Sequence, residues 1–169
     1  MLHKILFTTL FLIGVVGANG QNNVIKASAL IGNLGLQYER ALGDRFALIG
    51  QVGHSNFTNS VNDVETTSNG LGFLVEGRYY LSKNKERMEG WHIGVFYSAM
   101  NTESSEGLQT NIASLGIASG YQWVFGSHIS LGLVFGAGTF DYDSDQDRGL
   151  LLEGLTFWPH LGLSLGYRL

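Results

Sequence analysis

Cysteine is absent from this chain of 169 residues, so the sequence offers neither a disulfide framework nor a thiolate metal site. Charged residues make up only 14%, well below the roughly 25% of soluble domains, and would cover a water-exposed surface poorly. Beyond the N-terminal region, no segment has the ~18 unbroken apolar residues that a transmembrane helix needs. The composition therefore argues against both a soluble domain and a helical membrane protein.

The N-terminal region has the pattern of a secretory signal peptide. His3 and Lys4 give a short basic start, residues 5–16 are apolar, and Ala18-Asn19-Gly20 fits the small-x-small cleavage rule. A membrane anchor is disfavoured because the apolar stretch is short and lacks stop-transfer charges. We expect a signal peptide over residues 1–20 and one domain over residues 21–169.

The C-terminal nine residues alternate between large apolar and small or polar side chains, which predicts a β-strand with one apolar face. A tilted strand of roughly 9–11 residues crosses a bilayer core. The same alternation recurs along the chain and gives eight predicted strands: 24–31, 34–42, 46–54, 71–81, 91–98, 115–125, 129–136 and 161–169. Within 46–54, Ile49 breaks the pattern. The sequence therefore predicts an all-β, eight-stranded antiparallel transmembrane β-barrel of the outer-membrane type.

The predicted connections alternate in length. One set of connections is short: tight turns at 43–44 and 126–127 and a compact basic turn at 82–89. The connections between them begin with an equally short link at 32–33 and are then longer and polar, at 58–68, 102–107 and 142–153. Outer-membrane barrels have short periplasmic turns and longer outside loops, so we expect the acidic loops to face out of a Gram-negative cell envelope. A soluble lipocalin-type barrel is the alternative, but its outer wall would be too poor in charge. Aromatic residues gather near strand ends, as in an interfacial girdle: Tyr38, Tyr79, Trp91, Trp123, Phe125 and Tyr167.

Two short motifs carry a family resemblance. Tyr38-Glu39-Arg40-Ala41-Leu42, and the run from Glu76 to Lys83 followed by Glu89-Gly90, resemble an uncharacterised branch of the small OmpX/OmpA-like outer membrane protein beta-barrel domain family. The resemblance covers nearly the whole predicted mature chain and implies no reaction. It also implies contact with the barrel-assembly machinery, which reads an aromatic C-terminal residue. This chain ends in Leu169 instead, and Tyr167 is a partial substitute.

Five charged residues are predicted to face the lumen by strand parity: Lys26, Glu39, Glu76, Arg78 and Arg168. Gln37, Gln51, Gln122, His92 and His160 share that face. An eight-stranded barrel is just wide enough for side chains to fill it, and buried charges must then pair. Glu39 and Glu76 are the available acids for Arg78 and Arg168. A side-chain-filled barrel with a structural or interaction role is therefore expected, and a minor porin-like channel for small solutes is the alternative.

Two further patterns could carry chemistry. His128 and Ser130 are two residues apart on one predicted face and resemble the His-x-Ser pair of an outer-membrane lipid A deacylase. However, they follow a tight turn at the predicted periplasmic end, with no carboxylate placed beside them. Asp141, Asp143, Asp145 and Asp147 alternate in the last outer loop and could hold Ca²⁺ or Mg²⁺.

The calcium-binding EF-hand template fails in this aspartate run, because its sixth position is Gln146 and its twelfth is Leu152. We therefore expect a solvated acidic loop, no metal or cofactor, and no enzymatic activity; a lipid-modifying enzyme is the least favoured function. The expected partners are outer-membrane lipids and lipopolysaccharide rather than nucleic acid, and the expected state is a monomer in the cell outer membrane.

Overall fold

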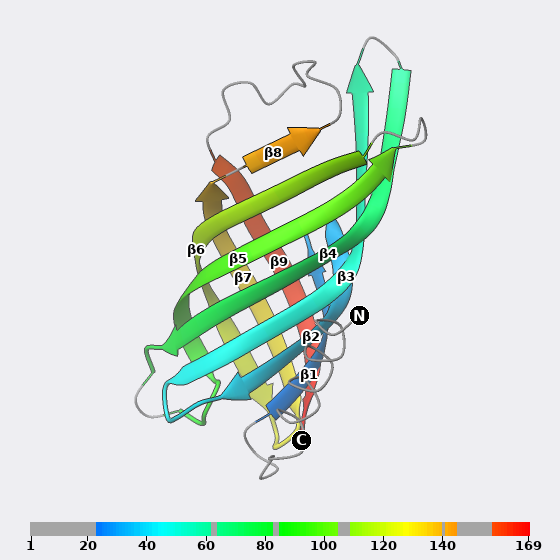
Figure 1. Cartoon of the computed structure of the whole chain (residues 1–169). Helices are drawn as coiled ribbons and strands as arrows, with labels where there is room; N and C mark the ends of the chain where they lie inside the picture. Colours follow the sequence, from blue (N-terminus) through cyan, green and yellow to red (C-terminus); the bar gives the residue numbers. More distant parts are fainter. Residues whose placement is uncertain (1–22, 62–63, 83–84, 105–108, 140, 145–156) are drawn as a thin grey trace, which may run out of the picture.

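The computed structural model describes residues 23–61, 64–82, 85–104, 109–139, 141–144 and 157–169. The strands are β1 (Asn23–Leu30), β2 (Asn33–Ala41), β3 (Phe46–Val61), β4 (Val64–Tyr80), β5 (Gly90–Ser104), β6 (Gln109–Phe125), β7 (Ile129–Thr139), β8 (Asp141–Ser144) and β9 (Phe157–Arg168). All pairings are antiparallel, and the pairing of β5 with β6 closes the sheet into a barrel (Figure 1). These ranges contain no helix that is long and apolar enough to cross a membrane.

Eight strands go around the barrel, although the described part of the chain has nine separate strand segments. β7 and β8 both pair with β6, and they do so in one continuous register: Gly116 lies opposite Gly138, and Ala113 lies opposite Asp141. β8 therefore prolongs β7 beyond residue 140. The prediction of an eight-stranded antiparallel barrel is confirmed.

The strand register fixes the tilt of the barrel. Following cross-strand partners once around the sheet from Trp91 leads back to Asn101, ten residues along the same strand. A stagger of ten over eight strands corresponds to a tilt of about 40°. At this tilt, a strand segment of about ten residues, at about 3.3 Å per residue, rises about 25 Å along the barrel axis. That is the height of the apolar band of outer-membrane barrels.

Several strands are longer than the alternation predicted. β3 and β4 run to Val61 and from Val64, so most of the polar stretch 58–68 is paired strand rather than loop. The prediction ended these strands too early because apolar alternation marks only the part of a strand that faces lipid. We call the end of the barrel with the extended β3–β4 hairpin the loop end, and the end with residues 42–45, 85–89 and 126–128 the turn end (Figure 1).

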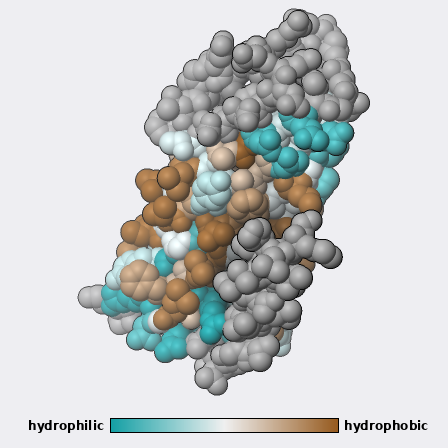
Figure 2. All heavy atoms as spheres, viewed as in Figure 1, coloured by the Kyte–Doolittle hydropathy of each residue, from teal (hydrophilic) through white to brown (hydrophobic). Residues whose placement is uncertain are grey.

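The outward face of the barrel is an apolar wall. Large apolar side chains of every long strand are exposed, and Figure 2 shows them as a band between polar surfaces. At the turn end the wall finishes in paired aromatic rings, including Phe46 against Tyr79 at 4.9 Å and Trp91 against Tyr121 at 5.4 Å. This arrangement is the lipid-facing surface of a membrane barrel.

Glycines let neighbouring strands and lumen side chains approach closely. A Cβ atom at Gly116 would lie 2.4 Å from the carbonyl oxygen of Ala137 and 2.7 Å from the ring of Phe96, whereas one at Gly77 would meet nothing within 4 Å. We expect Gly116→Ala to destabilise the barrel by about 1–3 kcal/mol, through overpacking against backbone, and Gly77→Ala to be nearly neutral. Denaturant unfolding in lipid vesicles measures both, and equal stabilities would contradict the inward assignment of Gly116.

Candidate functional site

The lumen at the turn end holds four buried ionised side chains, which we call the ion cluster: Lys26 on β1, Glu39 on β2, and Glu76 and Arg78 on β4. Each is at most 4% exposed. They face inward because they occupy the positions of their strands that alternate with the lipid-facing residues. Two cations and two carboxylates balance in charge, as buried ions must.

The ion cluster is bound together by short contacts. Glu39 forms an ion pair with Lys26. Arg78 donates from Nε and Nη2 to the two carboxylate oxygens of Glu76, at 2.7 and 2.8 Å, in a bidentate arrangement. Its Nη1 lies 4.0 Å from Oε1 of Glu39 and so joins the two pairs. The strands β1, β2 and β4 are thereby linked through the lumen.

Neutral side chains donate to or accept from the ion cluster. Lys26 Nζ donates to Oε1 of Gln122 at 2.5 Å, across the lumen from β1 to β6. The Tyr80 hydroxyl donates to Oε1 of Glu39 at 2.6 Å, and the Tyr80 ring lies 5.4 Å from that of His92. Tyr80, His92 and Gln122 are all at most 2% exposed. The turn-end half of the lumen is therefore filled by a polar network.

Arg168 is buried as well, but it is not part of the ion cluster. The sequence offered Glu39 and Glu76 as its partners; instead, Nη1 of Arg168 donates to Glu86 at 2.5 Å, and Nη2 donates to the carbonyl oxygen of Arg87 at 3.1 Å. Glu86 lies in the turn between β4 and β5, which folds under the barrel. The expected partner was wrong because Arg168 is at the very end of β9, where a turn residue is nearer than any lumen acid.

This turn closes the barrel at the turn end. Met88 has a positive φ of 59° and is 2% exposed, with its side chain packed in one cluster with Val24, Ala47 and Tyr80. On the surface of the turn, Lys85 donates to the Tyr121 hydroxyl at 2.7 Å and to Glu89 at 2.9 Å, and these bonds raise the pKa of Lys85. Sequence reasoning missed Met88, because an apolar residue in a charged turn gives no periodic signal.

An apolar layer lies above the ion cluster on the loop-end side. Five buried side chains form it: Ile49, Leu74, Phe96, Ala118 and Val134. Ile49, the exception to the predicted alternation, is fully buried. It faces the lumen, and Gly50 takes the outward position. The sequence predicted charged, amide and histidine side chains on the lumen face and missed this layer, because these apolar side chains sit among glycines and are too few to form a pattern.

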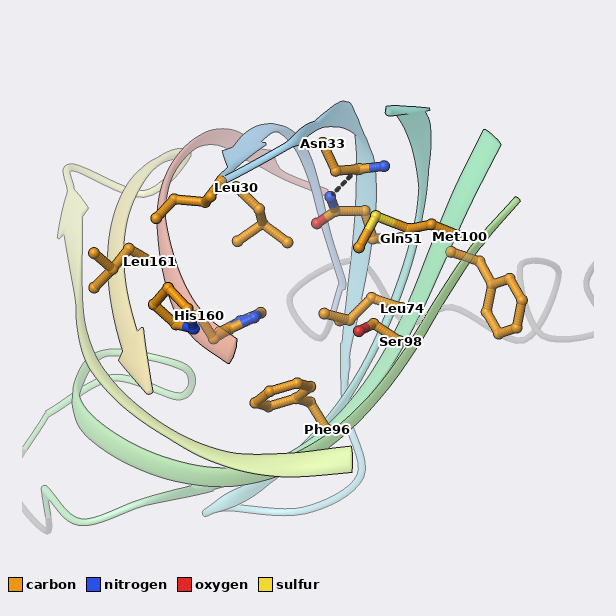
Figure 3. Close-up of a pocket in the computed structure, with 12 residues that line it drawn as sticks. Leu30, Asn33, Gln51, Leu74, Phe96, Ser98, Met100, His160 and Leu161 are labelled. Carbon is orange, nitrogen blue, oxygen red and sulfur yellow. Dashed lines mark hydrogen bonds between the residues drawn. The ribbon is translucent and has the colours of Figure 1, made fainter. Parts of the chain in front are cut away.

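Amide side chains and a small cavity lie at the loop-end mouth. Gln37 donates to Gln51 at 3.2 Å, Gln51 donates to Asn33 at 2.8 Å, and Asn33 donates to Ser55 at 2.9 Å. In Figure 3, side chains from several strands converge on the mouth, and the ring of His160 stacks on Phe96 at 4.2 Å. The cavity measures about 30 Å³, enough for one or two water molecules.

The structure separates the histidine and serine that were predicted to share a face. His128 lies in the turn after β6, is exposed, and stacks on the Tyr167 ring at 5.3 Å. Ser130 is 1% exposed, inside the barrel. The expectation failed because alternation holds only within a strand, and β7 begins at Ile129. The two residues are therefore not arranged as a nucleophile and its base.

The four alternating aspartates of the last predicted loop lie partly outside the described residues. Asp145 and Asp147 fall there, as does the predicted signal peptide; the backbone of Asp141 and Asp143 lies in β8. Within the described part of the chain, no group of three or more histidine or carboxylate side chains is placed to hold a metal ion.

Comparison with known families matches residues 3–148, most of the chain, to the family described as "Protein of unknown function (DUF3575)". The chain belongs to this family. Its description assigns no activity, so the family adds nothing to the chemistry of the lumen. A comparison with curated protein sequences found no match.

Two solved structures are similar to this DUF3575 member. CarO of Acinetobacter baumannii is similar with a TM-score of 0.54 at 7% identity, over 89% of this chain and 98% of CarO. Ail, the attachment invasion locus protein of Yersinia pestis, solved with the heparin analogue sucrose octasulfate, gives a TM-score of 0.45 at 12% identity, over 88% of this chain and 94% of Ail. At this identity, the likeness to CarO concerns the fold alone, which is that of an outer-membrane β-barrel.

Proposed function

We propose that this protein is a non-conducting outer-membrane barrel of the OmpX/OmpA-like group, with a structural or interaction role carried by its loop end. One observation carries the proposal: the lumen is filled along its axis. The turn with Met88, the ion cluster and the apolar layer follow one another from the turn end to the mouth cavity of about 30 Å³. Ions have no continuous water-filled path through such a sequence of layers.

We further propose that the loop end faces outward, because outer-membrane barrels have short periplasmic turns and longer outside loops. The described residues fit this orientation: β3 and β4 run on at the loop end to Val61 and from Val64, whereas the turn end has short connections at residues 42–45 and 126–128. Partners of the loop end would meet the extended β3–β4 hairpin.

Conductance across planar bilayers tests the proposal. We expect the refolded wild type to show no steady current at voltages where a porin reconstituted in the same way conducts. A stable wild-type current would contradict a filled lumen and would favour the alternative function, a minor pore for small solutes. A Glu39→Gln barrel measured in parallel adds a second criterion, since a change in its ion selectivity requires a wet lumen.

A further inference from the structure

The lipid-facing wall is not smooth near the loop end. A groove of about 470 Å³ lies over β4, β5 and β6, within the roughly 300–1,000 Å³ of small-ligand sites. Its floor is small because Ala99 and Ala113 lie directly opposite each other on β5 and β6. Phe73 and Tyr97, whose ring centroids are 6.0 Å apart, border it toward the middle of the wall.

Polar groups border the same groove at its loop-end side. Asn101 and Asn111 are opposite partners on β5 and β6, and the Asn101 amide donates to Oδ1 of Asn111 at 2.6 Å. Both residues are exposed, and one step further along the same face of β5 lies the exposed carboxylate of Glu103. No lysine or arginine of the described residues lies on this part of the rim. The rim above the groove is therefore polar, and among the described residues it bears one negative charge, at Glu103.

We propose that this groove binds one lipid of the surrounding leaflet, with an acyl chain over Ala99 and Ala113 and a head group that carries an ammonium at Glu103. The groove is continuous with the lipid-facing wall, so an acyl chain is the occupant that already surrounds it. The carboxylate of Glu103 attracts an ammonium and disfavours a bare phosphate, whereas the two amides can both donate and accept hydrogen bonds and favour neither group. Which leaflet surrounds the groove follows from the orientation of the barrel, on which neither the groove nor its preference depends.

Native mass spectrometry of the purified protein in detergent tests the groove, with phosphatidylethanolamine or phosphatidylglycerol of identical acyl chains as probes. We expect the wild type to retain one lipid, and phosphatidylethanolamine about two- to fivefold more than phosphatidylglycerol, as for an exposed ion pair. The double variant Ala99→Leu/Ala113→Leu fills the groove and is expected to retain either lipid about tenfold less. Ala137→Leu, on the exposed wall at β7, is the matched control and should behave as wild type.

The head group is tested separately with Glu103→Gln, which should bring retention of the two lipids to the same level. Unchanged lipid retention in the Ala99→Leu/Ala113→Leu variant would overturn the groove as a site. Equal retention of both lipids by the wild type would overturn the ammonium assignment. Neither result depends on whether the barrel conducts or which end faces outward, so failure here is distinct from failure of the proposed function.

Discussion

Glu39→Gln is expected to lower the free energy of unfolding by about 3–5 kcal/mol, because it leaves Lys26 and Arg78 buried without that carboxylate. Glu39 is fully buried, and both cations reach it. Denaturant unfolding in lipid vesicles measures the loss. Asp44→Asn is the matched control, since it also removes a paired carboxylate, but the Asp44 side chain is 85% exposed and that of its partner Arg87 is 47% exposed. That exposed pair should contribute less than about 1 kcal/mol.

A double variant separates the cost of leaving a buried cation unpaired from the cost of removing the Lys26–Glu39 ion pair altogether. Lys26→Met/Glu39→Gln removes one charge of each sign, so the ion cluster stays neutral, and we expect it to recover part of the stability lost in Glu39→Gln. If the lumen were wet, water would solvate the orphaned cations. Glu39→Gln would then be no more harmful than Asp44→Asn, and that result would contradict the filled lumen.

Leu163→Arg is expected to destabilise the folded barrel in bilayers by about 2–4 kcal/mol, because it places a charge on the lipid-facing wall far from either rim. Leu163 is 57% exposed on β9, between Leu161 and Leu165 on the same face. Leu169→Arg is the control, because the last residue of the chain lies at the turn-end rim, where a charge costs about 0–1 kcal/mol. Equal penalties at the two positions would contradict the membrane placement of the wall.

The lumen face of the same strand is not a neutral control. The sequence alone predicts that Ser164→Arg is milder than Leu163→Arg, provided that the lumen has room. However, Ser28, the partner of Ser164 on β1, is 2% exposed, and Gln122, two strands away in the same register, is fully buried, so the lumen offers little room there. We therefore expect Ser164→Arg to destabilise the barrel too, through overpacking rather than exposure of charge to lipid.

The sequence by itself determined the number of strands in the barrel and the two faces of each strand. The side chains of a strand alternate with a period of two, so the direction of Lys26, Glu39, Glu76 and Arg78 is a local property that needs no partner. Ile49 shows the limit of this rule. β3 alternates without a break, so Ile49 faces the lumen, but its apolar side chain there breaks the polarity pattern from which the two faces were predicted.

Only the tertiary structure decided which lumen side chains meet. The bond from Lys26 to Gln122 joins residues 96 apart in sequence, and it depends on the ten-residue stagger that closes the barrel. The pairing of Arg168 with Glu86 depends on how one turn folds under the turn end. Alternation fixes the face of a residue but not its height or its neighbour across the lumen, since those follow from register and closure.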